Sequence, residues 1–434
     1  METSVIIGIV VCFGILLVFL FAGVWVFGSM VVAGIVAGYF LVGSLDMTAY
    51  IPFNSASSWT LTAIPLFVFM GAIFQHGGIS EGLYRGASVL LGRFRGGLLH
   101  SNIGACALFA AITGSTTATA VTVGSVALPE LEKRNYAPEI TTGSLAAGST
   151  LGPLIPPSTP FIIYGSMTNT SIGKLFFAGL FPGLVETLLY MMVIFIWVSF
   201  RPGIAPAGER VTLKRLLLAM KDLGPIALIS VLVLGGIYMG VYTPVEAGAA
   251  GCICSLLLSL ALRRLSWKAL HEAALATIKT TTFVMIIIVG SAVLGNVLAQ
   301  LLIPFQLANW LAGLPVSPTM ILFFLCLMYL AFGCVIESLP VLIMTLPVVF
   351  PVAVELGFDL IWFGVVLVLL TNIGTITPPV GISLYAIQGL RTKGSLLDVI
   401  KGVIPFIFAA LVLLAIVIAF PPLSTWLPAQ MITR

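Results

Sequence analysis

Long apolar stretches alternate with short polar connections over almost the whole chain. Ten of these stretches come close to the ~20 residues that a helix needs to cross a bilayer. They lie at residues 5–21, 23–43, 60–78, 139–166, 175–200, 223–242, 245–262, 282–302, 362–388 and 402–420. The pattern predicts an all-α polytopic membrane protein with about ten spanning helices embedded in the lipid bilayer.

Two further apolar regions, about 97–131 and 318–352, have a different pattern. Each is too long for one simple span, and Gly, Pro and hydroxyl residues interrupt its middle. Irregular backbone at membrane depth is tolerated only where it is buried in protein or lines a cavity. We therefore expect two re-entrant hairpins, each entering and leaving the membrane on the same side.

The composition supports this class and excludes others. Hydrophobic residues make up 60% of the chain and charged residues only 8%, against about 25% charged in soluble domains. With 19 basic and 15 acidic residues, no basic face for nucleic acid is expected. The six cysteines lack zinc-ligand spacing and are expected to be buried apolar side chains. No phosphate-binding Gly-rich loop occurs, so ATP hydrolysis is not expected.

The distribution of basic residues predicts the orientation. Cytoplasmic loops of membrane proteins are enriched in Lys and Arg. With the N-terminus outside, 17 of the 19 basic residues fall on the cytoplasmic side, and the exceptions are Lys174 and Arg434. If either hairpin were a single span, every later loop would change sides and the asymmetry would collapse. The chain also begins without a basic segment, which predicts an anchor helix and no cleaved signal peptide.

The order of spans predicts an internal repeat of opposite orientation. Three spans precede each hairpin and two follow it, and the second set starts on the opposite side. The repeats cover residues 1–200 and 223–434, and we expect the loop at 201–222 to be a cytoplasmic amphipathic connector. The motif Gly-x-x-x-Pro-Pro occurs at Gly152 and again, 222 residues later, at Gly374. Each copy lies in a predicted broken helix, at 139–166 or 362–388.

The repeated motif points to ion binding. Proline has no N–H, so the carbonyl four residues earlier loses its helical partner. Pro156 frees the carbonyl of Gly152, and Pro378 frees that of Gly374. A bare carbonyl in an apolar slab is costly unless something binds it, and a sodium ion would do so. A plain proline kink is the alternative for either copy alone, whereas the symmetric pair favours ions.

The hairpin tips supply further polar groups. The first tip is rich in hydroxyls between Thr113 and Thr122, and the second runs from Gly333 to Pro340. Each tip is expected to present the N-terminus of a half-helix, where partial positive charge attracts an anion. No Lys or Arg lies in the tips or the breaks, so a bound carboxylate would rely on helix ends, hydroxyls and amides. Helix packing through small residues is the alternative explanation for the Ser/Thr run.

Three acidic residues lie near or within the expected membrane region. Glu337 is a candidate for coordinating an ion or carrying a proton, with simple capping of the tip as the alternative. Glu246 follows Thr243 and Pro244 in the pattern of a capping box. Glu186 lies in an apolar span and has no partner evident from the sequence.

Several runs of the chain carry a resemblance. They are residues 114–119, 146–158, 171–179, 242–248 and 374–384. In them the chain resembles the large membrane subunit of tripartite ATP-independent periplasmic (TRAP) transporters. The resemblance implies an inverted-repeat fold of the ion transporter superfamily, with a scaffold and an elevator transport domain that holds both hairpins. It also implies sodium-driven uptake of an organic anion at the bacterial inner membrane, with the N-terminus periplasmic and no cofactor besides coupling sodium ions. The implied partners are a small four-helix membrane subunit and a periplasmic substrate-binding protein.

The resemblance also assigns candidate site residues. One sodium site would fall on Thr113, Ser115, Thr116, Gly152, Ile155 and Pro157. A second would fall on Gly333, Gly374, Thr377 and Val380. Candidates for the organic anion are Thr117, Ser158, Glu337, Ser338, Asn372 and Ser383. The chain departs from common family patterns at Glu337, where Asp is frequent, and at Ser149 and Ser383, where Gly and Asn are common.

Two other functions remain open from the sequence. One is a symporter of the same superfamily that needs no binding protein. The other is an intramembrane enzyme, which would need a catalytic dyad at depth, such as paired Asp or His-Glu-x-x-His. Neither occurs, so we expect no enzymatic activity.

Overall fold

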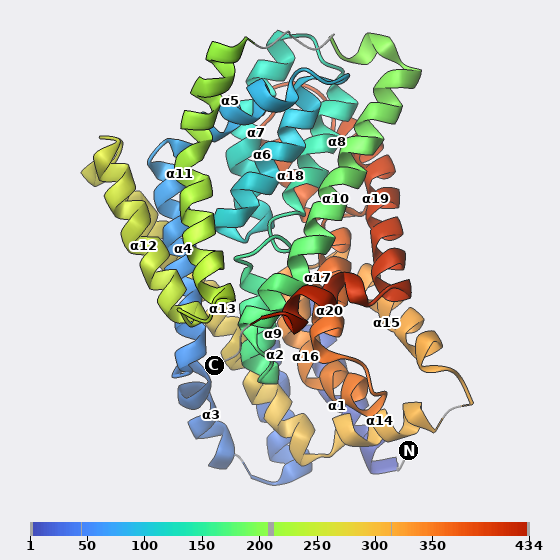
Figure 1. The fold of residues 1–434 in the computed structure, drawn as a ribbon. Helices are drawn as coiled ribbons and strands as arrows, with labels where there is room; N and C mark the ends of the chain where they lie inside the picture. Colours follow the sequence, from blue (N-terminus) through green and yellow to red (C-terminus); the bar gives the residue numbers. More distant parts are fainter. Residues whose placement is uncertain (1–2, 45, 207–211, 314, 432–434) are drawn as a thin grey trace.

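The protein is built from helices joined by short turns (Figure 1). The computed structural model describes residues 3–44, 46–206, 212–313 and 315–431, and these contain no strand. Seven helical segments in the described residues are long and apolar enough to cross a membrane, and five shorter apolar helices accompany them. The all-α polytopic membrane fold expected from the sequence is therefore confirmed.

The helices of the first half begin with five that precede the first hairpin. These are α1 (Thr3–Phe21), α2 (Val26–Ala37) with a π-helical end at Gly38–Val42, α3 (Asp46–Ala56), α4 (Ala63–His76) after a 3₁₀ turn at Trp59–Thr62, and α5 (Ile79–Leu91). The others are α6 (Leu98–Thr113), α7 (Thr116–Lys133), α8 (Pro138–Ser149), α9 (Thr159–Thr168) and α10 (Ile172–Phe200).

The second half repeats the same kinds of element. It opens with α11 (Leu213–Tyr238), α12 (Pro244–Ala261), α13 (Trp267–Gln300) and α14 (Ile303–Ala312). The others are α15 (Pro318–Gly333), α16 (Ser338–Glu355), α17 (Leu360–Ile376), α18 (Ile382–Gly389), α19 (Leu396–Ala419) and α20 (Pro422–Ala429).

Two helix pairs occupy the regions where hairpins were expected. α6 and α7 turn at Gly114, and α15 and α16 turn between Cys334 and Glu337. The first pair lies in the upper half of the molecule and the second in the lower half (Figure 1). Of these four helices, only α16 is long and apolar enough to cross a membrane. The polar residues between α15 and α16, and not the helix length, predicted that α16 belongs to a hairpin.

Each half also contains a broken helix. α8 ends at Ser149 and α9 starts at Thr159, whereas α17 ends at Ile376 and α18 starts at Ile382. The prolines in these gaps cannot donate the backbone hydrogen bonds that would continue the helix. The Pro156–Pro157 and Pro378–Pro379 bonds are both cis.

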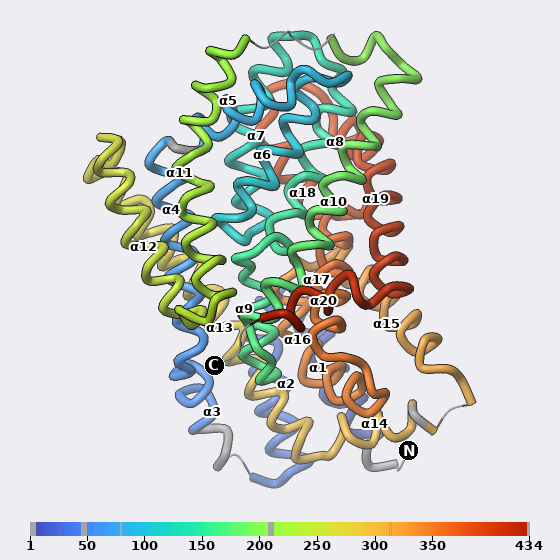
Figure 2. Tube along the Cα trace, viewed as in Figure 1, coloured from blue at the N-terminus to red at the C-terminus, as the bar shows by residue number. Residues whose placement is uncertain are grey.

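The broken helices lie at the centre of the molecule. Every residue of α8 from Ile140 to Ser149 is buried, and so is every residue of α17 from Trp362 to Ile376. α18 of the second half packs against α7 and α8 of the first (Figure 2). α8 packs extensively on α19, where a Cβ on Gly402 would lie 2.7 Å from the carbonyl carbon of Glu139. The two halves therefore interleave.

The predicted connector at 201–222 differs from the structure. Residues 213–222 are the first turns of the long helix α11 and do not form a separate surface helix. No helix-breaking residue interrupts them, and Ala219 is buried where the α11 backbone approaches Gly86 of α5. Residues 207–211 of the connector lie outside the described residues.

Four helices were not predicted from the sequence. They are α3, α5, α14 and α20, which have 8–13 residues each and join longer elements. Such segments are too short to span a bilayer, so hydropathy does not reveal them. α5 packs along α11, and Arg85 lies 3.7 Å from Asp222 across that contact.

Candidate functional site

The first hairpin tip meets the first break. Gly114 ends α6 with a φ of +58°, a conformation that suits glycine. A Cβ at this position would lie 3.1 Å from the Cα of Ser158. From the other side, a Cβ on Gly152 would lie 2.7 Å from the carbonyl oxygen of Ser115. The structure thus brings together the two segments that the sequence assigned to the first sodium site.

Oxygen atoms gather at this junction. The Thr119 hydroxyl donates to the Ser115 carbonyl at 2.8 Å and lies 3.3 Å from the Thr113 hydroxyl. The Thr116 hydroxyl is buried without a hydrogen-bond partner. Among the described residues, no backbone N–H donates to the Gly152 carbonyl. Carbonyl and hydroxyl oxygens of this kind are ligands that hard cations prefer.

Other residues of the first break form hydrogen bonds with each other. The carbonyl of Pro153, which Pro157 deprives of a helical partner, accepts a hydrogen bond from the Ser158 hydroxyl. The same hydroxyl caps α9 by accepting from the Phe161 N–H at 3.4 Å. Ser158 and Ile155 are buried. Ser158, a candidate for binding the anion, therefore has its hydroxyl engaged in forming the break.

The second hairpin tip meets the second break in the same way. A Cβ on Gly333 would lie 2.8 Å from the Cα of Gly374, so the two backbones touch. The Gly381 N–H donates to the Cys334 carbonyl at 2.9 Å, and Gly381 has a φ of +59°. Glycine is required at such positions because no side chain fits between the backbones.

One detail of the second break differs from the prediction. The Gly374 carbonyl accepts from the Thr377 N–H at 3.0 Å, so the expectation that it lacks a hydrogen bond is wrong. The last turn of α17 tightens into an i to i+3 bond, a common way of satisfying a helix end. The Thr375 carbonyl receives no backbone N–H in the described part of the chain. The Thr377 hydroxyl donates to the Ile373 carbonyl at 2.6 Å.

The two tips also touch each other. The Thr117 hydroxyl donates to the Glu337 carboxylate at 3.3 Å. Glu337 occupies the N-cap position of α16, but its side chain makes no capping hydrogen bond. The carboxylate therefore bridges the tips, and the capping alternative is wrong. Of the other candidates, Ser338 and Ser383 are buried, and Val380 is half-buried.

The two broken helices meet near the centre. The Asn372 side-chain amide donates to the Thr150 carbonyl at 3.4 Å, and the two residues are 222 positions apart. This is the offset of the repeated motif, so equivalent positions of the two halves contact each other. The amide oxygen of Asn372 is buried without a hydrogen-bond partner. The sequence analysis did not identify Thr150, which only the fold brings to Asn372.

Glu186 has partners that the sequence analysis missed. Its carboxylate accepts from the Tyr190 hydroxyl at 2.7 Å and from the Thr150 hydroxyl at 3.3 Å. The Tyr190 contact was recognisable from the sequence, because residues four apart share one face of a helix. Glu246 makes the predicted capping box with Thr243.

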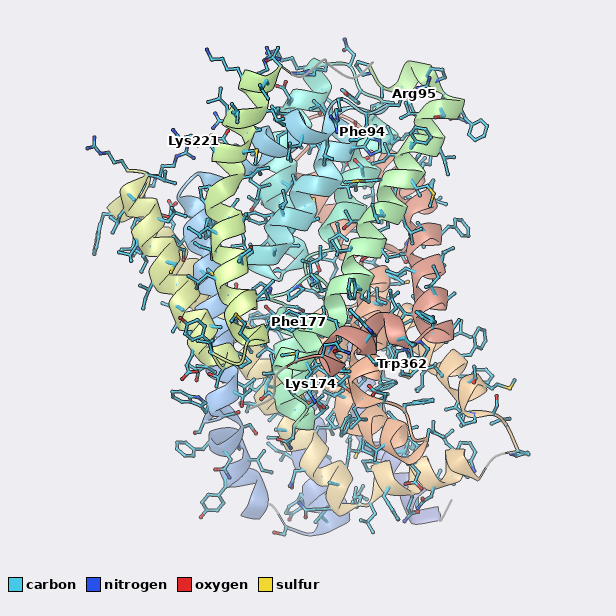
Figure 3. The ribbon with its side chains drawn as sticks, in the orientation of Figure 1. Phe94, Arg95, Lys174, Phe177, Lys221 and Trp362 are labelled. Carbon is cyan, nitrogen blue, oxygen red and sulfur yellow. The ribbon has the colours of Figure 1, made fainter. Side chains whose placement is uncertain are left out.

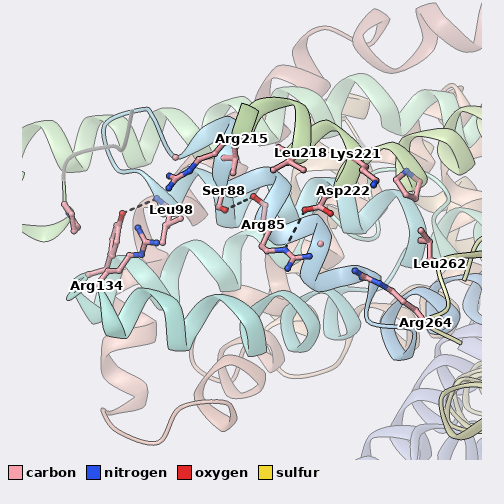
Figure 4. Close-up of a pocket in the computed structure, with 17 residues that line it drawn as sticks. Arg85, Ser88, Leu98, Arg134, Arg215, Leu218, Lys221, Asp222, Leu262 and Arg264 are labelled. Carbon is pink, nitrogen blue, oxygen red and sulfur yellow. Dashed lines mark hydrogen bonds and ion pairs between the residues drawn. The ribbon is translucent and has the colours of Figure 1, made fainter. Parts of the chain in front are cut away.

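A basic cavity of about 950 Å³ lies away from both tips, between α5, α11 and the end of α7 (Figure 4). Basic side chains from four predicted cytoplasmic segments line it, namely Arg85, Arg134, Arg215, Lys221 and Arg264. Arg95 and Lys221 lie at this end of the molecule, and Lys174 lies in the lower half (Figure 3). The segments that the distribution of basic residues assigned to the cytoplasmic side therefore lie at the same end of the molecule.

Comparison with known proteins identifies the family. Residues 13–423 match the model of the DctM component of tripartite ATP-independent periplasmic transporters. The chain belongs to this family. It is 36% identical to the C4-dicarboxylate TRAP transporter large permease protein of Pseudomonas aeruginosa, over 87% of this chain and 88% of that protein. It is 33% identical to the sialic acid TRAP transporter large permease protein of Vibrio cholerae, over 86% of both chains.

A solved structure agrees with the fold. The YdaH transporter of Alcanivorax borkumensis superimposes with a TM-score of 0.64 at 16% identity, over 87% of this chain and 89% of that one. The predicted membership among TRAP large permeases is confirmed. The named relatives are transporter permeases, in agreement with the expectation of a transporter and not an enzyme.

Proposed function

We propose that this TRAP large permease uses a sodium gradient to import an organic anion across the bacterial inner membrane. A periplasmic binding protein delivers the anion, a small four-helix membrane subunit completes the permease, and the N-terminus faces the periplasm. Relatives named for C4-dicarboxylates and sialic acid support the substrate class, because both are organic anions. The 17-to-2 split of basic residues supports the orientation.

The observation that carries the sodium proposal is the pair of tip-to-break junctions. Each joins a hairpin tip to a proline-broken helix through contacts that admit only glycine, at Gly152 and at Gly333 with Gly374. Unwound backbone carbonyls at discontinuous helices are typical sites of coupling ions in secondary transporters. The buried, unpartnered Thr116 hydroxyl and the bare Gly152 carbonyl favour a ligand at the first junction.

The anion would bind near the contact between the tips. α7 and α16 both start there, so two helix N-termini provide partial positive charge. Glu337 would repel a carboxylate, and bound sodium would offset that charge. Sodium and the anion are thereby coupled, and each strengthens the binding of the other by the same factor. This predicts that the anion binds more tightly when sodium is present.

The hairpins and the broken helices would move as one body. The tips contact each other, and α18 packs against α7 and α8, so these elements interlock. We propose that this body slides as an elevator along a scaffold made mainly of residues 5–43 and 223–262. Inverted repeats support such motion, because the same arrangement seen from either side gives the two end states.

Uptake in proteoliposomes tests the function. The permease is reconstituted with its small subunit, and uptake of a labelled organic acid is measured with sodium or potassium outside, with and without the binding protein. We expect uptake only when sodium and the binding protein are both present. Equal uptake in potassium would refute sodium coupling, and uptake without the binding protein would favour a self-sufficient symporter.

A further inference from the structure

Glu186 is a buried acid that neither sodium junction uses. It lies in α10 beside the first break and is 1% exposed. Its Oε1 atom contacts the Tyr190 and Thr150 hydroxyls, and its Oε2 atom is buried without a partner. An ionised carboxylate in such a place needs a compensating positive charge, because its desolvation is very costly.

No cation among the described residues contacts this carboxylate. α10 packs against α6, α8, α9, α17, α19 and α20. The ionisable groups of these helices are engaged elsewhere or lie far along the helix. His100 contacts the Arg95 carbonyl, and Asp398 contacts Arg391. The Tyr164 hydroxyl donates to the Leu360 carbonyl, and the Cys106 thiol packs against Gly148. Glu139, Lys174 and Asp359 lie in the first turn or at the N-cap of their helices, and Lys401 is exposed in the second turn of α19. Among the ionisable groups of the described residues, only the Tyr190 hydroxyl makes a hydrogen bond to Glu186.

The hydroxyl contacts around Glu186 outnumber the hydrogens available to make them. The Thr150 hydroxyl lies 2.7 Å from the Ala147 carbonyl, 3.3 Å from Glu186 Oε1 and 3.0 Å from the Tyr190 hydroxyl. The Tyr190 hydroxyl lies 2.7 Å from Glu186 Oε1. These four contacts have two hydroxyl hydrogens between them, since each hydroxyl has one. A proton on Glu186 supplies a third hydrogen and removes the buried charge.

We propose that Glu186 is a proton-binding site, occupied at neutral pH, that positions the first break. The protonated carboxyl accepts a hydrogen bond from the Thr150 hydroxyl. The Thr150 carbonyl in turn accepts a hydrogen bond from Asn372 in the second broken helix. Two residues further along the chain is Gly152, which packs on the first hairpin tip. When the proton leaves at alkaline pH, an uncompensated negative charge remains buried beside this connection, and this destabilises the fold. Glu186 is thus a positioning residue whose proton site does not depend on sodium coupling.

Infrared spectroscopy of the purified permease with its small subunit tests the proposal. A protonated carboxylic acid gives a C=O stretching band that an ionised carboxylate lacks. We expect the wild type to show such a band at neutral pH and Glu186→Gln to lack it. Glu337→Gln and Glu355→Gln are controls: they remove a half-buried and an exposed carboxyl, and both should keep the Glu186 band.

Thermal unfolding provides a second readout. The melting temperature of the wild type should fall from neutral to alkaline pH by about 2–4 °C more than that of Glu186→Gln, which stays neutral. Identical bands in the wild type and Glu186→Gln would show that Glu186 is ionised and would overturn the proposal. A Glu186 band that appears only without sodium would mean that sodium occupies the site, and this also overturns it. If Glu186→Gln does not fold, loss of the band from the wild type on alkaline titration, with Glu337→Gln as reference, decides the question. Sodium-independent uptake would refute only the function proposed above.

Discussion

The contact between Gly333 and Gly374 allows a sharp test of the second junction. In Gly333→Ala, the new Cβ would lie 2.8 Å from the Cα of Gly374, whereas ordinary contacts of this kind lie at 3.4–4 Å. The second hairpin tip and the second break must therefore separate by at least 0.6 Å, the difference between 3.4 and 2.8 Å. The atoms nearest to the new Cβ belong to the backbone of Gly374 and Thr371, so no side chain can rotate to make room.

The expected effect is on sodium affinity. Overpacking a tight contact costs about 1–3 kcal/mol, which corresponds to a change of about 5- to 150-fold in binding. We expect the sodium concentration for half-maximal uptake to rise by a factor in this range. Uptake of a labelled organic acid into proteoliposomes, measured against external sodium, gives this number.

The matched control is Gly235→Ala in α11, where an added Cβ meets no atom within 4 Å. It should keep the wild-type sodium dependence. Thermal unfolding of both variants separates misfolding from weaker ion binding. A folded Gly333→Ala permease with the sodium dependence of the wild type would refute the assignment of a sodium site to this junction.

Three further predictions concern other parts of the molecule. Thr377→Val removes the hydroxyl that donates to the Ile373 carbonyl, and sodium binding should weaken by about 1–3 kcal/mol in uptake assays; unchanged sodium dependence would exclude Thr377 from the site. Gly402→Ala forces a Cβ to within 2.7 Å of the Glu139 carbonyl carbon, and should destabilise the protein by about 1–3 kcal/mol or more in thermal unfolding; a wild-type melting temperature would contradict the close α8–α19 packing. Trp267→Cys in a cysteine-free background should react only with a maleimide added from the cytoplasmic side, because Trp267 is 83% exposed at a predicted cytoplasmic turn; labelling from the periplasm would reverse the topology.

The general layout of the fold was predictable because it depends on hydropathy and on residues that break helices. Gly114 and the Pro-Pro pairs mark turns and breaks by backbone chemistry alone, and the structure has them there. The helices α3, α5, α14 and α20 were not predictable, because short connecting helices leave no hydropathy signal of spanning length. α11 was misjudged at its start because a basic amphipathic run also suits the first turns of a spanning helix.

The candidate site was predictable in its segments but not in its contacts. Close packing at Gly152 and Gly374 follows from the motif, yet the Gly374 carbonyl found a partner in Thr377 through tightening of the last helical turn. The contacts of Thr117 with Glu337 and of Thr150 with Asn372 join residues more than 200 positions apart. Such contacts depend on tertiary packing, which no local pattern encodes.

The contact between Thr150 and Asn372 has a consequence for how the protein is made. Its two residues are 222 positions apart, and ribosomes add about 5–20 residues per second. After Thr150 has been synthesised, about 10–45 s pass before Asn372 exists. α8 also waits for α19, its most extensive packing partner. During that interval the first half has an incomplete, partly polar centre within the membrane. During biogenesis, the insertion machinery or neighbouring lipids must therefore shield the polar centre of the first half until the second half has been inserted.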